Sequence, residues 1–169
     1  MRLASLGLLL MVFGCESSLS WKSVNEMVRR DFPGVEHVSA EELNRRLESD
    51  DVPVLLDVRE ESEYNVSHLP GAVRVQPGSD TSELIETFEP DTPIVAYCSV
   101  GHRSSELVQK LTERGFTDVK NLDGSIFAWA NRGFPVERDG EKVREVHPFD
   151  DRWGTLLHED LRAYEPGAR

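Results

Sequence analysis

Short apolar runs alternate with helix-forming segments through the middle of the chain. Five runs have the length and composition of buried β-strands, at residues 35–38, 53–58, 72–75, 93–97 and 118–122. The segments between and after them carry apolar positions at helical spacing or capping residues, at residues 39–47, 60–65, 81–88, 104–114 and 123–131. Strands that alternate with helices at such short intervals predict an α/β fold, in which helices cover both faces of a mostly parallel sheet.

Another helix is predicted ahead of the sheet. It runs from Trp21 to Arg30 and carries Trp21, Val24 and Val28 along one face. We expect residues 15–34 to form a linker and a helix that braces the domain. The alternative is a helix on a membrane surface, which its shortness and the acidic chain behind it disfavour.

Residues 139–169 form an extension beyond the last predicted helix. His147, Phe149 and Trp153 make this segment too apolar for a plain disordered tail. We expect it to pack back on the domain and to include a short helix over residues 155–164. An arm that binds a partner protein is the alternative.

A single thiol stands where a predicted strand ends and a helix begins. The strand at residues 93–97 leads into the loop Cys98-Ser99-Val100-Gly101-His102-Arg103, and a helix that ends before Gly115 follows. This junction lies on the rim where open α/β sheets bind their ligands.

The position of Cys98 favours ionisation of its thiol. The first N–H groups of a helix have no partner and, together with the helix dipole, attract negative charge. Gly101 lets the backbone turn where a Cβ would clash, and His102 and Arg103 add donors. We therefore expect a lowered pKa for Cys98 and a nucleophile near neutral pH. A buried, unreactive core cysteine is the alternative.

An acidic residue is predicted to face the same rim. Asp57 ends the strand at residues 53–58, as Cys98 follows the end of its own strand. We interpret Asp57 as a residue that holds the catalytic loop or Arg103 in place. The alternatives are a helix N-cap and a structural salt bridge.

The loop and several other motifs resemble those of the rhodanese sulfurtransferases. Residues 98–104 are similar to the family's active-site loop, Cys-x-x-Gly-x-Arg-Ser. Residues 57–60, 63–64 and 67–72 resemble its upstream signature, and Gly115, Phe116, Val119, Leu122, Gly124, Trp129 and residues 133–136 resemble its C-terminal half. The resemblance covers one domain, residues 35–138. It implies a rhodanese-like three-layer fold with a central, mostly parallel five-stranded sheet and helices on both faces.

The resemblance also implies a reaction. The thiolate of Cys98 would take a sulfane sulfur from a small anionic donor such as thiosulfate and pass it to a thiol or cyanide, a protein thiol included. The implied catalytic residues are Cys98 and Arg103, the N–H groups of Ser99, Val100, Gly101, His102 and Arg103 would bind the transferred sulfur, and Asp57, Arg59 and His68 would support the site. A lone histidine beside a turn is more often structural, however. No organic cofactor is implied, and the histidines show no paired spacing for a metal.

Two other functions remain open. One is a rhodanese-like persulfide carrier or protein-binding module with little turnover. The other is a phosphatase or arsenate reductase, which the loop disfavours. Tyrosine phosphatases have five residues between cysteine and arginine, whereas four separate Cys98 from Arg103.

Composition narrows the range of partners. The chain of 169 residues has a formal net charge of −12 and an isoelectric point near 4.8. Such acidity argues against binding to nucleic acid and against electrostatic docking to anionic lipid. A cationic pocket in this chain must therefore be local.

The first residues resemble a bacterial lipoprotein signal. Residues 1–14 pair a short basic start with an apolar stretch too short to span a bilayer, and Cys15 follows Gly14. We expect cleavage before Cys15, a lipid on its sulfur and a membrane-anchored, extracytoplasmic protein on the periplasmic side. Ordinary secretory cleavage and an uncleaved anchor are the alternatives. Lipidation would leave Cys98 as the single thiol, which excludes a Cys-x-x-Cys redox mechanism.

Overall fold

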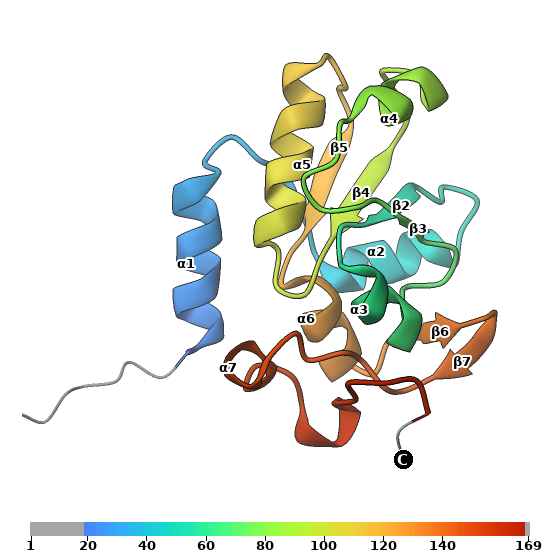
Figure 1. Cartoon of the computed structure of the whole chain (residues 1–169). Helices are drawn as coiled ribbons and strands as arrows, with labels where there is room; N and C mark the ends of the chain where they lie inside the picture. The colour runs from blue at the N-terminus through green and yellow to red at the C-terminus, as the bar shows by residue number, and fades with distance from the viewer. Residues whose placement is uncertain (1–18, 168–169) are drawn as a thin grey trace, which may run out of the picture.

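The fold is a parallel sheet between two layers of helices (Figure 1). The computed structural model describes residues 19–167. The strands of the main sheet are β1 (His37–Val38), β2 (Val54–Asp57), β3 (Val73–Arg74), β4 (Ile94–Tyr97) and β5 (Val119–Leu122). They pair in parallel in the order β1-β5-β4-β2-β3. The predicted α/β fold with a five-stranded parallel sheet is confirmed.

Helices and a small hairpin surround the sheet. The α-helices are α1 (Trp21–Asp31), α2 (Ala40–Leu47), α3 (Glu61–Val66), α4 (Ser82–Thr87), α5 (His102–Glu113), α6 (Ser125–Asn131) and α7 (Asp151–Gly154). An antiparallel hairpin joins β6 (Val136–Arg138) to β7 (Glu141–Val143), and η1 (Glu159–Leu161) is a 3₁₀ turn. The sequence pattern did not predict this hairpin.

Apolar side chains that point alternately to the two faces of the sheet form two hydrophobic cores. On one face of the sheet, Leu56, Ile94 and Ala96 pack with side chains of α5. On the other face, Leu55 and Val95 pack with side chains of α2 and α6. Because successive side chains of a strand point to opposite faces, four-residue strands are long enough to supply both layers.

Helix α1 packs against this second core through Val24 and Val28, which are 1% and 3% exposed. Its N-cap Ser20 accepts a hydrogen bond from the N–H of Ser23. Nη2 of Arg29 lies 3.2 Å from a carboxylate oxygen of Asp123, the residue that directly follows β5. The helix therefore stands beside the loop that precedes α5 (Figure 1).

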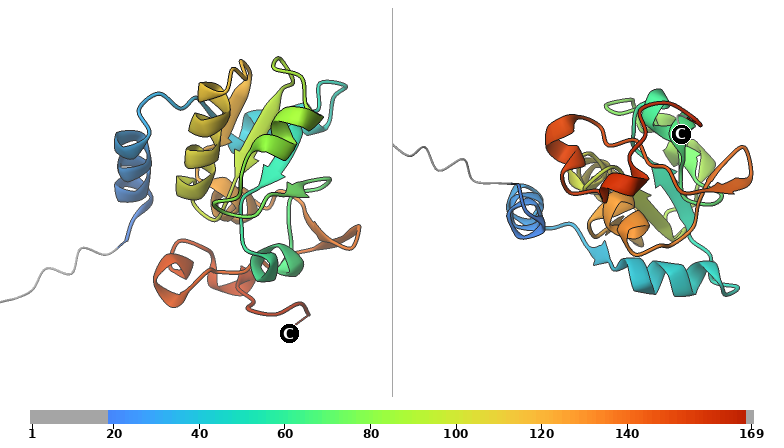
Figure 2. Two further views of the ribbon diagram at one scale, coloured as in Figure 1. Left: turned by 45° about the horizontal axis from the view of Figure 1, so that its top comes forward. Right: turned by 90° about the horizontal axis from the view of Figure 1, so that it is seen from below.

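The C-terminal extension belongs to the same core. Its Val146, Leu156, Leu157 and Leu161 are at most 7% exposed and cluster with residues of α2 and α6. Figure 2 shows the extension crossing below the sheet layers. The predicted helix over residues 155–164 is wrong: α7 ends at Gly154 and η1 spans three residues, because the apolar side chains are buried without helical periodicity.

The helix predicted at residues 123–131 begins later than expected. The N-cap of α6 is Gly124, with φ +69°, and not the first predicted residue, Asp123. A Cβ at Gly124 would lie 2.5 Å from that of Ala128 and 3.3 Å from the Trp21 ring. Glycine is required by this close packing, so Asp123 stays outside the helix and pairs with Arg29.

Residues 19–167 contain no helix long and apolar enough to cross a membrane. The predicted signal at residues 1–14 and the predicted lipidation of Cys15 lie outside the residues that the structure describes.

Truncation of Leu157 tests whether the extension contributes to the core. Leu157 is 1% exposed, so Leu157→Ala should lower the free energy of unfolding by about 2–5 kcal/mol. Urea denaturation measures the change. The matched control Val52→Ala truncates a side chain that is 56% exposed and should change it by less than about 0.5 kcal/mol. Equal effects of the two variants would contradict a structural role of the extension.

Candidate active site

The loop that carries Cys98 is fixed from behind by helix α6. The N–H of Cys98 donates to Oγ of Ser125 over 3.1 Å. The N–H groups of Ile126 and Phe127 donate to the carbonyls of Cys98 and Ser99 over 3.1 and 3.2 Å. The loop carbonyls are therefore bound by the start of α6. Ser125 itself has φ +50°, an unusual value for a residue other than glycine and typical of functional sites.

Gly101 closes the loop around the sulfur. Its φ is +108°, and a Cβ there would lie 3.1 Å from Nδ2 of Asn121. Its N–H donates to Sγ of Cys98 over 3.2 Å. The loop geometry thus requires glycine at this position.

Four further N–H groups of the loop are available to an anion. Among the described residues, the backbone N–H groups of Ser99, Val100, His102 and Arg103 donate to no protein acceptor. Ser99 and Val100 lie in the loop between β4 and α5, and His102 and Arg103 are the first two residues of α5, where the helix dipole also favours negative charge. The loop can therefore bind an anionic group beside the sulfur of Cys98.

Arg103 is held by Glu63, from the first turn of α3. Nη1 and Nη2 of Arg103 lie 2.7 and 2.8 Å from the two carboxylate oxygens of Glu63. Oγ of Ser99 donates to Glu63 over 2.8 Å and accepts from Arg103 over 2.9 Å. Glu63 is 2% exposed, and its two hydrogen bonds with Arg103 fix the orientation of the guanidinium.

Charge and hydrogen bonding set the protonation of these groups. Burial would raise the pKa of Cys98, but the charge of Arg103 and hydrogen bonds from Ser104 and Gly101 outweigh it and lower the pKa below its ordinary value. Burial would likewise raise the pKa of Glu63, and Arg103 outweighs it, so this pKa is also lowered. The site therefore holds an ionised carboxylate, a guanidinium and a thiol that ionises readily.

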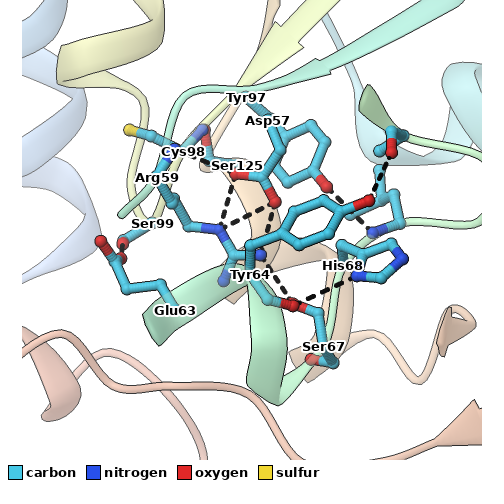
Figure 3. Close-up of polar contacts among 12 residues, drawn as sticks. Asp57, Arg59, Glu63, Tyr64, Ser67, His68, Tyr97, Cys98, Ser99 and Ser125 are labelled. Carbon is cyan, nitrogen blue, oxygen red and sulfur yellow. Dashed lines mark hydrogen bonds and ion pairs between the residues drawn. The ribbon is translucent and has the colours of Figure 1, made fainter. Parts of the chain in front are cut away.

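Asp57 does not hold Arg103, contrary to the sequence-based interpretation. Its carboxylate pairs with Arg59 over 2.6–3.1 Å, and Arg59 also donates to the carbonyl of Ser67 over 2.6 Å (Figure 3). Asp57 and Arg59 are both 0% exposed. The alternative of a structural salt bridge describes Asp57, because Arg59 binds both of its carboxylate oxygens.

The two histidines considered in the sequence lie in different places. His68 stacks on Tyr64 at 3.9 Å and lies 3.9 Å from a carboxylate oxygen of Glu137. In Figure 3 it lies on the far side of Arg59 from the sulfur of Cys98. His68 therefore contacts the β6–β7 hairpin, and its expected role in supporting the site stays a prediction. The side chain of His102 turns to Asp31, 3.3 Å away.

A cavity of about 280 Å³ opens over the loop. It is lined by Met27, Cys98, Ser99, Val100, His102, Arg103, Phe149 and Trp153. Although the Cys98 residue is only 1% exposed, it lines this cavity, which gives small molecules access to the loop. No cluster of histidine, cysteine, aspartate or glutamate within the described chain has the makeup of a metal site.

Glu63 is the main residue that the sequence analysis did not assign. It was recognised as part of a family signature, but its contact with Arg103 spans forty positions. A search for an acid near the end of each strand on the rim would have found it, because α3 begins just after β2. No local sequence pattern marked Met27, Phe149 or Trp153 as residues of the site.

Comparison with known proteins connects the loop to one family. The family model "Rhodanese-like domain" matches residues 39–132. The chain is 34% identical over 101 residues to YtwF of Bacillus subtilis (strain 168), which covers 60% of this chain and 96% of that protein. It is 32% identical over 93 residues to the thiosulfate sulfurtransferase GlpE of Pseudoalteromonas translucida (strain TAC 125), covering 55% of this chain and 87% of GlpE.

Other relatives are larger or are known from solved structures. A tRNA uridine(34) hydroxylase of Enterobacter sp. (strain 638) is 29% identical over 138 residues, which are 76% of this chain but 38% of the hydroxylase. The crystal structure of Alr3790 from Anabaena sp. superposes with a TM-score of 0.56 at 30% identity and covers 60% of this chain and 81% of that one.

Removal of the charge pair should raise the pKa of Cys98. In the double variant Glu63→Gln with Arg103→Gln, no buried carboxylate is left unpaired, and the thiol loses its neighbouring cation. The pH dependence of alkylation by iodoacetamide should shift to higher pH. Removal of the exposed Arg144–Asp160 pair with Arg144→Gln and Asp160→Asn is the control and should leave the profile unchanged. An unshifted profile in the first variant would contradict the role of Arg103.

The same pair should make stability depend on pH. Because the pKa of Glu63 is lower in the folded protein than its unfolded value of about 4.3, its contribution is fully present above that value. The contribution is lost as the pH falls through the folded pKa. Urea denaturation should therefore show a steeper loss of stability below about pH 5 in the wild type than in the Glu63→Gln, Arg103→Gln variant. The same loss of stability with pH in both proteins would contradict the proposed role of Glu63.

Proposed function

The chain belongs to the rhodanese-like family, and we propose that it transfers sulfane sulfur through a persulfide on Cys98. The donor is thiosulfate or a similar small anion, and the acceptor is a thiol or cyanide. The observation that carries the proposal is the set of unpartnered loop N–H groups around a thiol with a lowered pKa. Similarity to sulfurtransferases such as GlpE supports the same class of reaction.

In the first step the thiolate attacks the outer sulfur of thiosulfate. A bond forms between Sγ of Cys98 and that sulfur, the S–S bond of thiosulfate breaks, and sulfite leaves with the electron pair. Cys98 then carries a persulfide anion. The N–H groups of Ser99, Val100, His102 and Arg103 are suited to stabilise the charge on its outer sulfur, as an oxyanion hole does for oxygen.

Arg103 acts by its charge and position. Its two terminal nitrogens are bound to Glu63 and Ser99, so the donor would meet the backbone N–H groups first. The guanidinium lowers the pKa of Cys98 and keeps the nucleophile ionised. Glu63 is a positioning residue in this scheme, because it acts on the reaction through Arg103.

A persulfide carrier with little turnover is the second candidate. The 1% exposure of Cys98 favours it, since a nearly buried sulfur limits the rate with bulky acceptors. A carrier and an enzyme share the first step and differ in how fast small acceptors remove the sulfur. The hydroxylase relatives support no tRNA substrate for this chain, whose net charge is −12.

The location of the protein is a proposal that residues 1–15 alone support. Residues 1–14 and Cys15 resemble a lipoprotein signal, and we propose a lipid anchor on Cys15 at the periplasmic side of a membrane. Contact with the membrane would then be through that lipid only.

Mass spectrometry of the intact protein tests the persulfide. Incubation with thiosulfate should add the mass of one sulfur atom, and later addition of cyanide should remove it and yield thiocyanate. Cys98→Ser should abolish both changes, because serine forms no persulfide. The matched control Cys15→Ser should retain them, and the same spectra report whether Cys15 carries lipid. A protein that gains no sulfur at Cys98 would refute the proposed function.

A further inference from the structure

Three of the four apolar side chains that line the cavity above Cys98 come from outside the matched family domain. Met27 belongs to α1, Phe149 precedes α7 and Trp153 lies within α7, whereas the family match spans residues 39–132. The loop at the base of the cavity lies inside that match. The reactive loop at the bottom of the cavity therefore belongs to the family domain, whereas most of the apolar wall belongs to segments outside it.

The walls are apolar even though a guanidinium lies behind them. Met27, Val100, Phe149 and Trp153 supply hydrophobic surface to the cavity. The ring of Phe149 covers the guanidinium of Arg103, with the carbon Cζ 5.0 Å from the ring centroid.

The polar side chains of Arg103 and His102, which also line the cavity, are bound to acidic residues. Glu63 occupies two nitrogens of Arg103, and the side chain of His102 turns to Asp31. A group inside the cavity therefore meets hydrophobic side chains, with polar N–H groups only at the base.

The size of the cavity limits what can enter. A volume of about 280 Å³ is close to the lower end for small-molecule pockets. A protein segment would have to displace Phe149 or Trp153. The segment that carries them is bound to the core through Val146 and Leu157, which are 0% and 1% exposed. The net charge of −12 also disfavours an anionic molecule of appreciable size.

We propose that the sulfur acceptor is a small, uncharged organic thiol with an apolar group that lies between Met27, Phe149 and Trp153. This proposal rests on the proposed function, since the thiol must meet a persulfide on Cys98. The N–H groups at the base bind the anionic sulfur, and the apolar walls select the acceptor.

The second step balances without an added reductant. The persulfide anion of Cys98 and the thiol R–SH give the thiolate of Cys98 and the product R–S–SH. A bond forms between the acceptor sulfur and the outer sulfur, and the bond from that sulfur to Sγ breaks. The electron pair of the broken bond stays on Sγ, and the thiol proton passes to the transferred sulfur.

Discharge of the loaded protein tests the choice of acceptor. Full-length protein is loaded with thiosulfate, the persulfide is verified by mass, and its loss is timed with benzyl mercaptan and with 2-mercaptoethanol at equal thiolate concentration. Burial of the benzyl group should make the apolar thiol roughly tenfold faster or more. Met27→Gln makes one wall polar, and Trp153→Ala removes another. Each variant should reduce the ratio of the two discharge rates by about threefold or more.

The two substitutions lie on different elements, so a folding defect in one leaves the other informative. Val52→Ala is the matched control: it truncates an apolar side chain at the opposite end of β2 from the rim, and the ratio should be unchanged. A loaded protein that discharges equally to both thiols would overturn the proposal, as would a ratio that survives both wall variants. Discharge only to a protein thiol would also overturn it. Failure to load sulfur at all is distinguishable, because it refutes the proposed function itself.

Discussion

The paired contact between Arg103 and Glu63 is the interaction on which the site depends. It joins the first turn of α5 to the first turn of α3 and includes Ser99 of the loop between them. An isolated cation of this burial would be costly, and an isolated carboxylate equally so. Together they hold a positive charge beside Cys98 while leaving the loop N–H groups without protein acceptors. The reactivity of one sulfur atom thus depends on a residue from another strand–helix unit.

The sequence predicted the elements whose cause is local. Apolar runs marked all five strands of the sheet, and the order of β4, loop and α5 placed Cys98 at the rim. It did not predict contacts that arise only when distant segments meet. Asp57 and Glu63 are both acids near the end of β2, and only the assembled sheet shows that Glu63 reaches Arg103 while Asp57 pairs with Arg59.

The errors at the chain's periphery have a similar origin. Residues 155–164 have enough apolar side chains for a helix, but those side chains fill gaps against α2 and α6 rather than forming one stripe. Asp123 is a good N-cap by residue type, yet the closeness of Trp21 and Ala128 requires glycine one position later. In each case tertiary packing prevailed over local preference. The roles of Met27, Phe149 and Trp153 depend entirely on such packing.

The near-complete burial of Cys98 has a consequence for the lifetime of the protein. A thiolate that attacks sulfur also reacts with peroxides, and oxidation beyond the sulfenic acid is in general irreversible. Residues 19–167 contain no second cysteine to trap the sulfenic acid as a disulfide. A sulfur in a residue that is 1% exposed, under an apolar cavity of about 280 Å³, is shielded from bulky oxidants. The same enclosure that limits which reactants reach Cys98 thereby protects a sulfur atom that no other thiol among residues 19–167 can rescue.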